Sequence, residues 1–263
     1  LTMHQYRQPC ILLNEMMRLI IILILNCTIL LGRDFAYPMK NGTRQMGVFQ
    51  PRVYGIKNNM ELSTHPILFL IKPNVQLKKF HGEINGLGLA FRYSFDYPTL
   101  LIRLFQRDGI GGLLADDSDI GKVPHFFVFQ SECLVTKKFP HYSFTGKLGM
   151  SLCPGCDLDS RHVIDYDLIY PRMALYHYGM GGNTGLDIDY IYSEKIFIKA
   201  DVDMFFIPHE KMFLEHKLLF SYSLTKKYVL TVGYKYSYGY YPFNIEEGLW
   251  NLFPLLDLSW QWR

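Results

Sequence analysis

Long apolar runs are absent from most of this sequence. After residue 32 no stretch of about 18 apolar residues occurs, which is the length that a helix needs to cross a bilayer. Cysteine is scarce, with 5 among 263 residues, and no second CxxC motif or histidine pair completes a zinc site. The net charge is only +3 and no long basic run occurs, which disfavours nucleic acid as a partner. The length fits one domain.

Alternation of apolar and polar residues dominates residues 185–240. At every second position the residues are apolar in four successive runs, which begin at Leu186, Ile196, Met212 and Tyr228. The intervening residues are mostly small or charged, and a period of two is that of a β-strand. Each run is about 10–14 residues long, enough to cross a membrane at a steep tilt, whereas soluble strands have about 5–6. The pattern predicts an all-β fold, a transmembrane antiparallel up-and-down β-barrel with apolar residues facing lipid.

Further strands are expected at residues 46–56, 60–70, 75–80, 86–97, 125–137, 142–152, 168–178 and 252–263. Pro51 and Pro66 are expected to kink the first two of these. A short helix is predicted at residues 98–108, inside a long connection. The count is about 10–12 strands, and we expect twelve because barrels of this class prefer even numbers.

One feature of this count is inconsistent. Short turns near Ser193 and Lys226 are typical of the periplasmic end, but the count places the long 98–124 connection at that end too. Either a strand between residues 139 and 184 has been miscounted, or the 98–124 segment folds into the lumen as a plug or constriction.

The first residues have the form of an export signal. Residues 1–15 lack any pattern that the rest of the chain needs, and we interpret them as a non-native or untranslated extension. Met16-Met17-Arg18 and the apolar run 19–31 indicate a signal peptide at residues 16–36, cleaved after Ala36. Residues 37–263 then form a single barrel domain. A lipoprotein anchored at Cys27 is the alternative.

The end of the chain carries a family resemblance. Residues 252–263 alternate apolar and polar positions up to Trp260 and Trp262. This segment resembles the closing strand of bacterial outer-membrane β-barrel proteins, although their last residue is aromatic and here Arg263 follows. The resemblance concerns architecture only. It implies the outer membrane of a bacterial cell as the location, with the lipid bilayer and the barrel assembly machinery as partners.

Acidic residues form the main candidate site. Asp187, Asp189, Asp201 and Asp203 share the parity expected for the lumen on neighbouring strands. A turn centred on Glu194 places Asp189 opposite Lys199 and Asp187 opposite Asp201. Close carboxylates need compensation by cations, protonation or metal. The basic partners expected in the lumen are Arg92, Arg172, Lys199, Lys217 and Lys235.

Three interpretations of the acidic residues remain open: a solvated wall balanced by these cations, a cation-selective constriction, or a calcium site. We assign no metal ligand, cofactor or catalytic residue. The glycine-rich run 179–185 precedes a strand, so a hairpin loop is expected there. Cys153 and Cys156 form a candidate disulfide, with reduced thiols or a redox pair as alternatives.

The expected function is a porin-like channel or a solute-binding barrel that takes small solutes or cations through a polar, Asp-rich lumen. One alternative is a structural or assembly barrel that conducts nothing. The other is a lipid-modifying enzyme, because His141 and Ser143 on one strand resemble a pair in outer-membrane phospholipase A. Here the pair has lumen parity, and Gly155 stands where that enzyme would have an asparagine.

Overall fold

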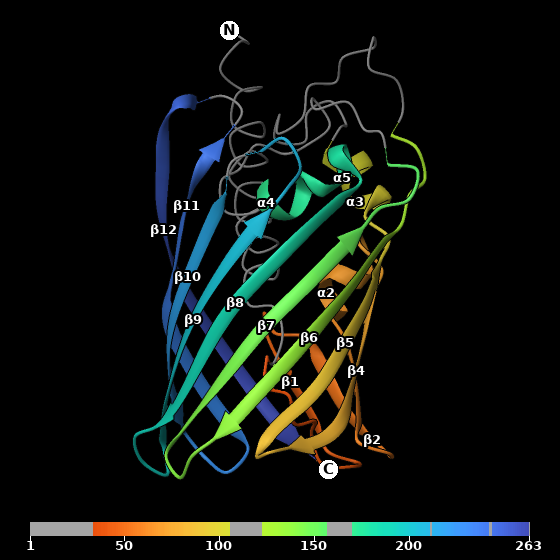
Figure 1. The fold of residues 1–263 in the computed structure, drawn as a ribbon. Coiled ribbons are helices and arrows are strands. Elements are labelled where there is room, and N and C mark those ends of the chain that lie inside the picture. The colour runs from red at the N-terminus through yellow and green to blue at the C-terminus, as the bar shows by residue number, and fades with distance from the viewer. Residues whose placement is uncertain (1–33, 106–122, 157–169, 211, 242–243, 263) are drawn as a thin grey trace, which may run out of the picture.

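The computed structural model describes residues 34–105, 123–156, 170–210, 212–241 and 244–262. Their strands form one closed antiparallel barrel, in which sequence neighbours pair and the first strand pairs with the last (Figure 1). The strands are β1 Arg44–Gly47, β2 Arg52–Ile56, β3 Met60–Thr64, β4 Asn74–Ile84, β5 Leu87–Asp96, β6 Val128–Lys138, β7 Tyr142–Leu152, β8 Met180–Ile191, β9 Ile196–Phe206, β10 Phe213–Ser223, β11 Tyr228–Tyr241 and β12 Asn244–Trp262. The predicted up-and-down barrel is confirmed.

The two ends of the barrel differ. Short turns join the strands at the lower end of Figure 1. Two of these turns contain Asn58-Asn59 and Asn85-Gly86, all with positive φ, as tight hairpin turns require. Longer connections on the opposite side carry the helices, which are α2 Pro66–Phe69, α3 Thr99–Phe105, α4 Tyr170–Met173 and α5 Leu175–Tyr178. Of these, α2 lies lower in the barrel than the other three (Figure 1).

The strand expected at residues 168–178 was wrong. In the described part of this segment, α4 and α5 occupy residues 170–178. Without that strand, the connection after β5 lies at the same end as the helices, opposite the short turns (Figure 1), which removes the inconsistency in the count. The expected hairpin loop at 179–185 was also wrong, because β8 begins at Met180. Only Gly179, with φ 75°, acts as a terminator, at the end of α5.

The prolines divide the first part of the wall more sharply than expected. Residues 46–56 were expected as one kinked strand, but the chain bends before Pro51 and forms β1 and β2. Pro66 ends β3 and occupies the first turn of α2, where a missing N–H costs nothing. The wall is therefore built from strands of 4 or 5 residues at β1–β3 and of 10 or more from β4 onward.

The alternation of β8 and β9 places apolar residues outside, as predicted. Leu186 and Val202 are 47% and 37% exposed, whereas Asp187 and Asp201 are each 1% exposed. Among the described residues, no helix has the length and apolar character needed to cross a membrane.

An apolar core lies at the helical end of the lumen. Leu68 of α2, Ile102 of α3 and Tyr176 of α5 pack there with Phe126, which precedes β6, and with Phe213 of β10. The predicted helix in the 98–124 connection is confirmed as α3, and Ile102 is fully buried in this core. The remainder of that connection, residues 106–122, lies outside the described residues.

Candidate functional site

The acidic residues of β8 and β9 lie opposite one another inside the barrel. Asp187 pairs in register with Asp201, and Asp189 with Lys199, which is the register that the turn at Glu194 predicted. Two buried carboxylates side by side repel each other unless a cation offsets them. The compensating groups therefore decide what the site can do.

Lys147 of β7 lies at the centre of this site. Its Nζ is 2.7 Å from Asp187, 2.9 Å from Asp201 and 2.6 Å from Asp203. Gly185 separates Lys147 from Asp203 in the register, and a Cβ there would stand 2.7 Å from Lys147 Cε. The missing side chain lets the lysine reach all three carboxylates. The sequence prediction omitted Lys147, although its parity with Ser143 on the same strand indicates a lumen position.

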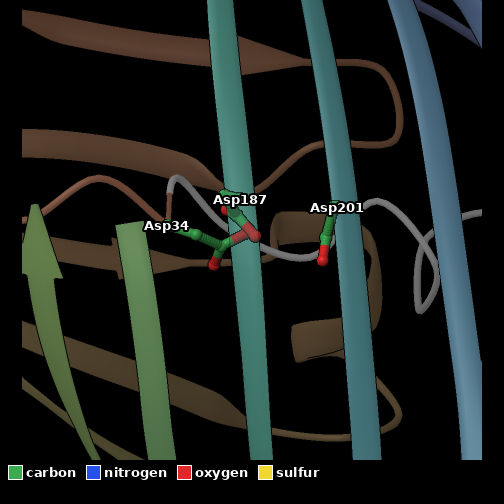
Figure 2. Close-up of side chains that lie close together, drawn as sticks. All are labelled: Asp34, Asp187 and Asp201. Atoms are coloured by element: carbon green, nitrogen blue, oxygen red, sulfur yellow. The ribbon is translucent and has the colours of Figure 1, made fainter. Parts of the chain in front are cut away.

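Three more cations complete a charged layer across the lumen. Lys217 is 2.6 Å from Asp201. Lys199 is 3.0 Å from Asp34 and 3.1 Å from Asp187, and Arg92 is 2.6 Å from Asp34. We call these residues the charged layer: Asp34, Asp187, Asp201, Asp203, Arg92, Lys147, Lys199 and Lys217. Figure 2 shows how Asp34, Asp187 and Asp201 approach one another.

Asp34 does not belong to the wall. It precedes β1, inside the predicted signal peptide, yet it is only 4% exposed in the lumen. Burial opposes its ionisation, but the charges of Lys199 and Arg92 outweigh burial and hold the pKa of Asp34 well below its ordinary value. Nothing in the alternation of the strands indicates this residue, which is why the prediction missed it.

Residues 34–43, here called the lumen strap, are fastened along their length. Thr136 Oγ1 accepts a hydrogen bond from Ala36 N (2.9 Å), and Phe35 O accepts one from Lys78 Nζ (2.9 Å). Glu61 accepts one from Met39 N at 2.8 Å. Gly88 in the wall leaves room for Tyr37 of the strap, since a Cβ at Gly88 would stand 2.7 Å from the ring of Tyr37. Cleavage after Ala36, as predicted, would remove the Asp34 end of the strap.

A second ion cluster lies beside the layer. Glu215 of β10 pairs with Arg172 of α4, whose Nη2 is 2.7 Å away, and with Lys235 of β11 at 2.6 Å. All the predicted basic residues thus reach a carboxylate. Asp189 is the exception among the predicted acids: Ser143 Oγ, 3.5 Å away, is its one hydrogen-bond contact in the part of the chain that the structure describes.

The geometry favours lysine over metal as the compensating charge. Carboxylate oxygens of Asp34, Asp187 and Asp201 lie within 4.8 Å of one another, which is close enough to share a cation. The ammonium groups of Lys147 and Lys199 already contact these oxygens. A metal ion bound there would have to displace or neutralise them.

The other predicted residues lie away from the layer. Cys153 and Cys156 are joined in a disulfide just after β7, with Cα atoms 5.4 Å apart. His141 is exposed in the turn before β7, and Ser143 is buried against Asp189. Within the described residues no hydrogen bond links His141 to Ser143, so the structure does not assemble a nucleophile with its base.

Two cavities flank the charged layer. The lower cavity, about 680 Å³, opens toward the short turns and is lined by Ser221, Lys226, Lys227 and Thr231. The upper cavity, about 200 Å³, extends toward α5. Asp34 and Lys217 border both, so the layer is the partition between them.

No family model and no curated protein matches the sequence. Among solved structures the barrel is similar to a bacterial polysaccharide outer membrane secretin, with 9% identity, TM-score 0.43 and coverage of 84% of this chain and 70% of that one. It is also similar to the outer membrane channel DcaP of Acinetobacter baumannii, with 8% identity, TM-score 0.39 and coverage of 86% of this chain and 60% of that one. A third similar structure is OmpT of Vibrio cholerae, with 9% identity, TM-score 0.40 and coverage of 83% and 64%.

The chain spans 60–70% of the length of these three proteins, and identities this low concern the fold alone. The architecture itself is a closed antiparallel up-and-down β-barrel with an apolar outer face, as the sequence predicts for an outer-membrane protein. Its closed wall satisfies the backbone hydrogen bonds within the bilayer, and its exposed apolar side chains suit contact with lipid.

Proposed function

We propose that this barrel binds and passes small solutes, and that the charged layer holds it closed in the state described here. The supporting observation is the lower cavity of about 680 Å³, which reaches from the short-turn end to Asp34. A barrel with a purely structural role would fill that space with side chains. Passage beyond the cavity requires the layer to open.

The lumen strap supplies the means of opening. Every other member of the charged layer lies on a strand that is hydrogen-bonded on both sides, whereas Asp34 lies on a segment outside the barrel wall. If Asp34 withdraws, Lys199 and Arg92 each lose a carboxylate partner and the partition between the cavities thins. Solute passage then depends on the position of the strap.

The charge balance of the layer bears on selectivity. Asp187, Asp189, Asp201 and Asp203 were expected to favour cations. The layer contains three of these together with Asp34, but it also holds three lysines and one arginine. We expect the double change of Asp187 and Asp201 to asparagine to shift ion selectivity toward anions, most clearly at low salt where screening is weak. Reversal potentials in asymmetric salt measure this shift.

A non-conducting barrel is the second candidate. It is favoured by the completeness of the pairing, since each charge of the layer contacts an opposite charge. The predicted assembly machinery partner applies to either candidate, whereas a channel held closed by Asp34 requires signal cleavage ahead of residue 34 and not after Ala36. The lipid-modifying enzyme loses support because His141 and Ser143 are not hydrogen-bonded to each other.

Planar-bilayer recordings separate the two candidates. The refolded protein should conduct in brief openings, and Asp34→Asn should lengthen them because the strap loses its ion pairs. Glu194→Gln removes one negative charge from an exposed turn and is the matched control. Absence of conductance in both the parent protein and Asp34→Asn would contradict the solute channel and support the structural barrel.

A further inference from the structure

A row of uncharged polar residues crosses the wall of the upper cavity. Ser63, Gln76, Ser94, Gln130 and Ser151 are consecutive partners in register across β3–β7, and all five line the cavity. Serine and glutamine thus alternate over five adjacent strands. We call these five residues the Ser-Gln row. Its composition differs sharply from the adjacent charged layer.

Two side-chain hydrogen bonds within the wall use part of the hydrogen-bonding capacity of this row. Ser63 Oγ donates to Gln76 Oε1, and Ser94 Oγ donates to Gln130 Oε1, each at 3.0 Å. Each hydroxyl occupies one end of an amide and leaves the other end to the cavity. Within the described residues, neither amide nitrogen has a hydrogen-bond partner, nor has Ser151 Oγ. These side chains are only partly buried or exposed to the lumen, so water or a solute satisfies them.

The charged groups around the same cavity are matched. Lys72 is 3.4 Å from Asp96, and Arg172 pairs with Glu215. Arg92 is shared by two carboxylates, one of them Asp34. The other charged lining residues belong to the charged layer and are paired there. An ionic solute would therefore find no unmatched charge to bind, and would have to break an existing pair.

His65 adds no charge to the cavity. Its Nδ1 accepts a hydrogen bond from Leu68 N at 3.3 Å, and its Nε2 donates to Phe49 O at 3.0 Å. Burial lowers the pKa of His65, against the smaller opposing effect of hydrogen bonds to the backbone of Phe49 and of His65 itself. The ring is neutral and both of its nitrogens are engaged.

We propose that the Ser-Gln row binds an uncharged, polyhydroxylated solute such as a sugar. Free amide N–H groups donate, serine oxygens accept, and a hydroxyl-rich ligand offers both functions from every hydroxyl. The cavity of about 200 Å³ suits a small unit rather than a long chain. This inference deepens the proposed function by naming the class of solute.

Calorimetric titration of the full chain in a detergent without a sugar headgroup tests the inference. The probes are glucose, and gluconate and glucosamine as charged molecules of similar size. Glucose should bind, and each charged analogue should bind at least several-fold more weakly because no unmatched charge awaits it. Gluconate or glucosamine binding as tightly as glucose would overturn the proposal, as would absence of glucose binding to the folded protein.

Variants locate the site. Gln130→Leu should weaken glucose binding roughly fivefold to tenfold, as expected for one lost hydrogen bond. Gln261→Leu makes the same change in the lower cavity and should leave binding unaltered. Ser151→Ala removes no hydrogen bond made within the described residues, so it tests binding without loosening the wall. Equal weakening by Gln261→Leu, or unchanged binding in both Gln130→Leu and Ser151→Ala, would contradict the assignment.

Conductance is recorded separately, so the two proposals can fail independently. Glucose binding without conductance would contradict the solute channel and leave the Ser-Gln row as a binding site. Conductance without glucose binding would contradict the Ser-Gln row as a sugar site and leave the solute channel supported.

Discussion

The inner and outer faces of the wall reverse the arrangement of a soluble protein. On β9, Asp201 faces the lumen and is 1% exposed, whereas the adjacent Val202 faces outward and is 37% exposed. The outer face needs only to match lipid. The inner face has to compensate buried charges one by one, since an unpaired buried charge costs far more than an exposed apolar group. Sensitivity to substitution should therefore be greater inside than outside.

The largest effect is expected at Lys147. Lys147→Ala leaves three buried carboxylates without their shared cation, and breaking a buried ion pair in this way costs about 3–5 kcal/mol. Urea unfolding in vesicles measures the loss. Lys226→Ala, in an exposed turn, is the control and should change stability little. Similar losses of unfolding free energy in the two variants would show that the charged layer stabilises the fold no more than an exposed charge does.

A smaller loss is expected on the outer face. Val202→Arg places a charge against the lipid and should cost roughly 2–4 kcal/mol if residue 202 lies near the midplane. Tyr222→Arg lies close to a short turn, where the cost should fall to about 0–1 kcal/mol. The same unfolding titrations compare them. Equal costs at both positions would contradict the depth assigned to β9.

The wall from β8 to β11 could be predicted because the apolar or polar character of each residue indicates which face of the wall it occupies. Alternation of apolar and polar residues sets the two faces, and the short turn at Glu194 sets the register of Asp187 with Asp201. Both are local properties of the sequence. The short helices could not be found in the same way, because α4 and α5 have only 4 residues each. A strand and two short helices of similar apolar content look alike without a longer period.

The candidate site was predicted in part for a related reason. The aspartates were found because they occupy the polar positions of regularly alternating strands. Lys147 was overlooked, although it has the same parity signal on β7. Asp34 carries no such signal, because a segment outside the wall owes its position to contacts with residues far away in sequence, such as Lys199. Only the folded barrel brings them together.

Acid should lower the free energy of unfolding by protonating Asp34 on the inner face. The apolar outer face should not respond to pH in this way. The pKa of Asp34 is held below its ordinary value of about 4, so its ionised form stabilises the docked strap at every pH above that value. The contribution is lost as the pH falls through the depressed pKa. The protein should exceed Asp34→Asn in unfolding free energy by about 1.5–3 kcal/mol at neutral pH. A difference that already vanishes between pH 6 and about 4 would contradict the low pKa.

The smallest effect is expected where the inner face is polar but uncharged. Ser221 shares a hydrogen bond with Thr231 at 2.9 Å, and both residues line the lower cavity. Ser221→Ala removes this bond, but Thr231 can bond to water in the cavity, so the cost should stay within about 1 kcal/mol. Unfolding titrations of Ser221→Ala beside Lys147→Ala then separate polarity from charge. Comparable losses would mean that any polar group in the lumen is critical, whereas a wide gap would show that buried charge makes the inner face sensitive.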